Sequence, residues 1–135
     1  EHFATVEQVD TMKRKQFVKG MNQIAQEGAI QIFFEPGGGM ERVIVGVVGV
    51  LQFEVLEYRL KNEYGVDVRR SNLSYQHIRW IENEGFSPAS LNITSDTKWV
   101  QDFRGKNLLI FTSEWNIRWA LEKNPELVLS EFSRN

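Results

Sequence analysis

The sequence has no cysteine, only two histidines and only three prolines among 135 residues. Without cysteine the chain cannot form disulfide bonds, a thiolate nucleophile or a cysteine-ligated zinc site. His2 and His77 stand far apart, and neither has the spacing to a second ligand that a metal site needs. The residue types therefore favour a protein without catalytic or metal chemistry of its own.

Long hydrophobic runs are also missing, because Gly or Gln breaks each apolar stretch before it reaches membrane-spanning length. No secretory signal is visible. We therefore expect no membrane partner and a reducing, cytoplasmic location. The first residue is Glu1 rather than Met, which leads us to expect a piece of a longer chain.

The net charge is only −2, yet the basic residues are gathered in two blocks. Residues 11–20 and 68–80 carry basic side chains and no acid, whereas residues 81–102 are acidic. The two blocks supply seven candidate contacts to an anionic partner such as RNA: Lys13, Arg14, Lys15, Lys19, Arg69, Arg70 and Arg79.

The first block falls in the opening turns of an expected helix, where the helix dipole disfavours each cation by about a few tenths of a kcal/mol. An external anion would offset that cost, although a solvated helix face explains the lysines equally well. In the second block Tyr75 and Trp80 could stack on RNA bases, but a core position is the favoured reading of Trp80.

Hydrophobic spacing predicts an α+β fold in which residues 1–71 form a ferredoxin-like β-α-β-β-α-β sandwich. Asp10 or Thr11 caps the first helix, and Gly28 and Gly65 end the two helices. The expected strands are 3–9, 29–34, 42–49 and 66–69, and the second helix is 51–64. The predicted buried stripes are Phe17, Met21, Ile24 and Ala25 in the first helix, and Phe53, Leu56, Leu60 and Tyr64 in the second.

Residues 72–135 are predicted to form a C-terminal α+β extension that packs on the first unit. The expected elements are strands 77–82, 98–102, 107–111 and 127–129 and a helix from Ser113 to Pro125. Its predicted buried side contains Ile117, Ala120 and Leu121, with Trp115 and Trp119 as packing residues.

The glycine clusters do not fit a phosphate-binding loop, because neither 37–39 nor 46–49 is followed by Lys-Ser/Thr. The first is predicted to be a hairpin tip, and the second a tight turn from strand to helix. We therefore expect no nucleotide in this chain. An RNA-recognition motif shares the strand and helix order, but the strand at 42–49 lacks the aromatic residues that such a motif uses.

Three stretches resemble the C-terminal domain of the peptide chain release factor 3 family, which is related to elongation factor G. They are KQFVKGMNQIAQEGAIQIF at 15–33, VGVVGVLQFEVL at 45–56 and RLKNEYGV at 59–66. Residues 77–81 and 115–125 also resemble the extension of that domain. The resemblance covers most of the chain and is thinnest over 82–112.

The resemblance implies a bacterial translation termination factor, a GTPase that helps to remove class I release factors from the ribosome. It implies contact with small-subunit ribosomal RNA and protein, and an indirect link to the class I release factors. GTP or GDP and magnesium would bind in a G domain preceding this one, so this piece would not itself be an enzyme and would hold no cofactor.

Two rival hypotheses come from other functional classes. Ferredoxin-like units often serve as small-molecule-sensing regulatory domains, but fold alone does not fix function. An enzyme would require a polar pocket with a perturbed carboxylate or histidine.

Overall fold

The computed structural model describes residues 2–37, 42–85 and 87–132. The chain divides into two compact units, Glu1–Ser74 and Tyr75–Asn135. Each unit contains one four-stranded antiparallel sheet. The predicted α+β class is confirmed, whereas the boundary after residue 71 and the packing of the second unit on the first stay predictions.

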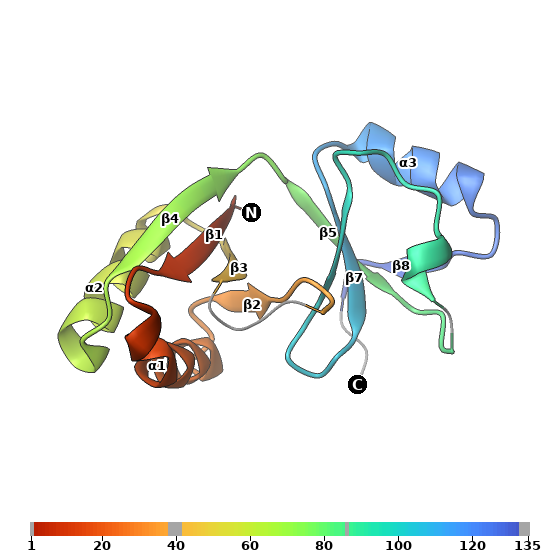
Figure 1. The fold of residues 1–135 in the computed structure, drawn as a ribbon. Helices are drawn as coiled ribbons and strands as arrows, with labels where there is room; N and C mark the ends of the chain where they lie inside the picture. The colour runs from red at the N-terminus through yellow and green to blue at the C-terminus, as the bar shows by residue number, and fades with distance from the viewer. Residues whose placement is uncertain (1, 38–41, 86, 133–135) are drawn as a thin grey trace. The chain divides into compact units, whose positions relative to one another are not determined.

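The first unit has the predicted β-α-β-β-α-β order, and its strands are arranged β2-β3-β1-β4. Both of its helices lie against the same face of the sheet (Figure 1). The elements are β1 His2–Gln8, the 3₁₀ turn η1 Thr11–Lys13, α1 Arg14–Gln26, β2 Gln31–Phe33, β3 Arg42–Val47, α2 Leu51–Tyr64 and β4 Val68–Leu73.

Strand β1 is central and pairs with β3 on one side and β4 on the other. Its alternate residues Ala4 and Val6 point to the helices and share a buried core with the predicted helix stripes. Phe3 points to the opposite face, where its ring meets that of Phe33 at a centroid distance of 6.4 Å. The sheet therefore has an aromatic contact on the face that the helices do not cover.

Two glycines make these contacts possible. A Cβ at Gly20 of α1 would lie 2.8 Å from Leu60 Cδ2 and 2.9 Å from Tyr64 Cδ2, so glycine permits the close approach of the two helices. A Cβ at Gly46 would lie 3.0 Å from Phe3 Cε1. Gly46 therefore lies inside β3 and makes room for an aromatic ring, and its predicted role in a strand-to-helix turn is wrong.

The fourth strand begins two residues later than predicted because α2 ends in a wider C-terminal turn. Gly65 adopts φ +69°, and the Val66 N–H donates to the Leu60 carbonyl at 2.9 Å. This ending resembles the Schellman motif but is one residue wider, and the apolar residue after the glycine likewise packs back on the last turn. Val66 is accordingly buried in the core. The predicted stop at Gly28 is confirmed, with φ +83°.

The second unit arranges its strands as β6-β7-β5-β8, and its core includes Leu109, Phe111, Ile117, Ala120 and Leu127. Its elements are β5 His77–Ile81, the 3₁₀ turn η2 Pro88–Ser90, β6 Lys98–Gln101, β7 Asn107–Phe111, α3 Glu114–Lys123 and β8 Leu129–Ser130. Leu127 lies in a turn, since its N–H donates to the Asn124 carbonyl, so the last strand begins later than predicted.

Helix α3 begins as predicted, with Ser113 Oγ accepting from the Asn116 N–H at 3.3 Å. The Asp96 carboxylate accepts from Thr112 Oγ1 at 2.9 Å and Asn116 Nδ2 at 3.2 Å, which ties a distant loop to the first turn. A hydrogen bond from the Thr94 side chain, followed by those from Thr112 and Asn116, lowers the pKa of Asp96. Trp115 and Leu121 are exposed rather than packed, because both lie on the solvent side of α3; those two predictions are wrong.

Candidate nucleic-acid interface

The first basic block lies at the start of α1 and is here named the α1 basic cluster: Lys13, Arg14, Lys15 and Lys19. Asp10, one of the two residues predicted to cap the helix, accepts from the Met12 N–H at 2.9 Å. It thereby caps the η1 turn that leads into α1. Helix α1 then starts at Arg14 without a side-chain cap or an acid in its first turn. The cluster therefore lies at the positive end of the helix dipole.

The side chains of the α1 basic cluster are exposed. Within the described part of the chain, Lys13, Lys15 and Lys19 form no ion pair. Helix α1 contains no acidic residue at all. The positive charge of these three lysines is thus not compensated by an ion pair within the described residues, which suits this surface to bind a polyanion.

Two amides extend this surface beyond the residues that the sequence indicated. Asn22 and Gln26 are exposed and follow Lys15 and Lys19 at helical spacing along the solvent side of α1. Amide side chains hydrogen-bond phosphates, ribose hydroxyls and base edges. The spacing i, i+4, i+7 and i+11 from Lys15 is the signal that could have identified them.

The second basic block has internal partners. Arg69 lies opposite Glu7 across β1 and β4, with Nη1 3.2 Å from Glu7 Oε1. Arg70 pairs with Glu57 at 3.1 Å and lies over the Phe53 ring, 5.1 Å from its centroid.

Arg79, in the second unit, pairs with Glu131 at 3.4 Å and donates to the Ile78 carbonyl at 2.8 Å. Trp80 beside it is half-buried. Arg69, Arg70 and Arg79 stay predicted contacts, but each already has a carboxylate partner that a phosphate would have to displace. The α1 basic cluster is therefore the stronger candidate.

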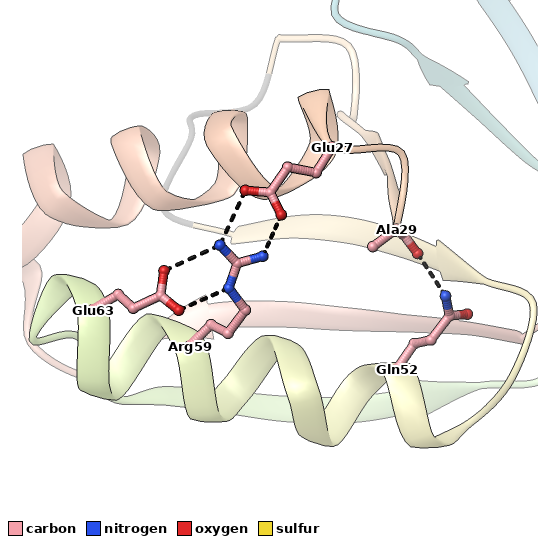
Figure 2. Close-up of polar contacts among 5 residues, drawn as sticks. All are labelled: Glu27, Ala29, Gln52, Arg59 and Glu63. Carbon is pink, nitrogen blue, oxygen red and sulfur yellow. Dashed lines mark hydrogen bonds and ion pairs between the residues drawn. The ribbon is translucent and has the colours of Figure 1, made fainter.

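The far end of α1 is fastened to α2 by Arg59 (Figure 2). Its guanidinium donates to both carboxylate oxygens of Glu27, at 2.6 and 3.0 Å, and to both of Glu63, at 2.9 and 3.1 Å. The Arg59 hydrogen bonds lower the pKa of Glu27 and of Glu63, and the two carboxylates raise that of Arg59. The ion pair between Arg59 and Glu27 holds the end of α1 in place relative to α2.

Gln52 fixes the turn between β3 and α2 on the same side of the unit (Figure 2). Its Oε1 accepts from the Val48 and Gly49 N–H groups at 2.9 and 3.0 Å, and its Nε2 donates to the Ala29 carbonyl at 2.9 Å. One side chain thus satisfies three backbone groups, two in the turn between β3 and α2 and one in the turn between α1 and β2.

An enzyme or a small-molecule sensor would need a pocket lined by suitable polar groups. A hollow of about 800 Å³ in the second unit is lined by residues that include Trp80, Asn83 and Lys106. The four groups with clearly shifted pKa values, Glu27, Arg59, Glu63 and Asp96, all lie outside it. A small-molecule-sensing role stays a prediction.

Residues 2–37, 42–85 and 87–132 contain neither a cluster of metal ligands nor a helix suited to a membrane. No three His, Cys, Asp or Glu side chains gather there as metal ligands would. None of the helices in those ranges combines the length and apolar character required to cross a bilayer.

Comparison with known proteins gives a consistent result. Residues 1–121 match the family model described as "Class II release factor RF3, C-terminal domain". The chain is 44% identical over 128 residues to "Peptide chain release factor 3" of Symbiobacterium thermophilum, which covers 95% of this chain. It is 38% identical to the protein of that name from Nostoc punctiforme and 42% identical to that from Staphylococcus saprophyticus, each over 96% of this chain. The chain spans about a quarter of the length of these relatives, 24% in each case.

Proposed function

The chain belongs to the C-terminal domain family of class II release factor RF3, and from that membership we propose that it is the ribosome-contacting part of a translation termination factor. The α1 basic cluster is the surface that would bind ribosomal RNA of the small subunit. A ribosomal protein beside that RNA would be a second partner. Arg69, Arg70 and Arg79 are secondary candidates for the same role.

The activity of the complete polypeptide is part of this proposal, because the chain spans only 24% of its relatives. The complete factor would be a cytoplasmic GTPase that promotes dissociation of class I release factors from the ribosome. GTP or GDP and magnesium would bind in a domain preceding this one. Because it binds the ribosome, the present domain would couple the nucleotide state of the G domain to the ribosome. It would contribute no catalytic residue of its own.

The observation that carries the proposal is the exposed positive charge of Lys13, Lys15 and Lys19 on a chain whose net charge is −2. Intramolecular ion pairs occupy the arginines of the second block, but Lys13, Lys15 and Lys19 form none within the described residues. Lysines held at a helix N-terminus cost stability through the dipole. An anionic partner offsets that cost.

The triple substitution K13E/R14E/K15E in the complete factor tests this proposal. Each lost phosphate contact lowers the slope of log affinity against log salt by about 0.7. We expect weaker ribosome binding at low salt and a flatter salt dependence, measured by pelleting the ribosome-bound factor at several potassium concentrations.

The matched control is K61E/R118E/K123E, which changes the net charge equally at exposed positions on α2 and α3. We expect the control to bind ribosomes much more tightly than the α1 variant does. Equal losses in the two variants would show that total charge alone governs binding. Unchanged binding of the α1 variant at all salt concentrations would remove α1 from the interface.

A further inference from the structure

Helix α2 carries a second apolar face, directed away from the core. Val48, Val50, Leu51, Val55 and Tyr58 are 82%, 55%, 70%, 55% and 64% exposed, and we name these five residues the α2 apolar face. Leu51, Val55 and Tyr58 recur at i, i+4 and i+7, on the side of the helix opposite the buried Phe53, Leu56 and Leu60. Contiguous exposed apolar residues of this kind mark interaction sites.

The turn that presents the two valines is firmly held. Gln52 accepts from the N–H groups of Val48 and Gly49, and it donates to the Ala29 carbonyl, as Figure 2 shows. The exposed side chains thus stand on a fixed backbone, so little conformational entropy is lost when a partner covers them. A preformed apolar surface favours a preformed protein partner.

The charges within this stretch of sequence do not favour nucleic acid as the partner of this face. From Val48 to Tyr58 the charged residues are Glu54 and Glu57, and there is no Lys or Arg. A phosphate backbone would be repelled there, whereas it would be attracted to α1. The two helices of the unit therefore present surfaces suited to different partners.

The position of the α2 apolar face relative to the start of the domain identifies the occupant. His2, at the beginning of β1, pairs with Val47, the residue before this face. In the family the matched region is a C-terminal domain and forms about a quarter of the relatives' length. The preceding part of such a polypeptide enters the domain beside Val47, which places it next to the α2 apolar face at high effective concentration.

We propose that the α2 apolar face is the docking surface for the domain that precedes this one in the complete polypeptide. The inference rests on membership of the family and does not depend on the proposed ribosome contact of α1.

Thiol protection tests the proposal directly, since this chain has no native cysteine. V55C and L51C are made in the 135-residue chain and in a complete polypeptide of the family whose other cysteines are replaced. A thiol within an interface reacts only when the interface opens. We therefore expect the V55C and L51C thiols to react with a maleimide at least about tenfold more slowly in the complete polypeptide than in the 135-residue chain. The control N22C, exposed on α1, should react equally fast in both.

The remaining outcomes contradict the proposal. Equal reaction rates for V55C in the two polypeptides would show that the preceding domain leaves this face open. Protection in the 135-residue chain that increases with its concentration would assign the face to a second copy. Protection that requires added ribosomes would assign it to a ribosomal component.

Discussion

Arg59 is the residue that most tightly connects separate parts of the first unit. Its guanidinium binds Glu27 at the end of α1 and Glu63 in its own helix. The pair with Glu63 follows from the i, i+4 spacing and could be predicted from the sequence. The pair with Glu27 could not, because it depends on how the two helices pack.

The Arg59 ion pairs make the stability of the chain depend on acid pH. The pKa values of Glu27 and Glu63 are lowered from 4.5 by Arg59, so these groups stabilise the folded state above pH 4.5, and the contribution is lost as pH falls through their lower folded values. We expect R59M to flatten the decline of unfolding free energy below pH 4.5, as measured by urea denaturation at a series of pH values. A decline as steep as in the unsubstituted chain would show that these pairs add nothing.

Gly20 shows how a missing side chain determines the distance between two helices. In G20A the new methyl group would meet Leu60 and Tyr64 at less than 3 Å, and overpacking of this kind costs about 1–3 kcal/mol. We expect that loss of unfolding free energy in urea denaturation. G49A is the control, because a Cβ there meets nothing within 4 Å; it should leave stability unchanged or slightly raised. Equal effects of G20A and G49A would contradict the packing argument.

At the scale of elements, the helices could be predicted from the sequence better than the strands could. The spacing of Phe53, Leu56 and Leu60 predicts the bounds of α2 because helix periodicity is a local signal. The start of β4 depends instead on the turn at Val66, and the start of β8 on a hydrogen bond to Asn124. These are contacts that a run of β-forming residues does not reveal.

At the candidate site too, the features that depend on neighbouring residues could be predicted, and those that depend on distant residues could not. The sequence indicated the lysines of α1, since they cluster along the chain. It did not show that Arg69, Arg70 and Arg79 have carboxylate partners, because Glu7, Glu57 and Glu131 are distant in sequence. Nor did the buried stripe of α2 indicate the apolar face on its other side.

The start of α3 depends on one hydroxyl group. Ser113 Oγ accepts from the Asn116 N–H, and replacement of such a cap by alanine costs about 1 kcal/mol. We expect S113A to lower the unfolding free energy by that amount. S95A, at an exposed serine of the loop before β6, is the matched control and should have little effect. If the two variants were equally stable, the hydroxyl would not act as a cap.

At the scale of the whole molecule, the distribution of charge matters more for binding a polyanion than the net charge does. A net charge of −2 predicts weak attraction to polyanions, yet the local potential beside α1 is set by the α1 basic cluster. We expect the isolated 135-residue chain to be retained on heparin and K13E/R14E/K15E to elute at clearly lower salt. K61E/R118E/K123E should elute between the two. Co-elution of the two triple variants would contradict a localised site.

The central position of β1 has a consequence for synthesis of the chain. Strand β1, the first strand of this unit along the chain, is bonded on both edges, to β3 and to β4, and its partners reach as far as Leu73. During synthesis the segment 2–8 therefore lacks its first neighbour until β3, Arg42–Val47, has emerged, and its second until β4, Val68–Leu73, has emerged. Long-range pairing of this kind slows folding. Trimming those few N-terminal residues would separate β3 from β4 and divide the sheet at its middle.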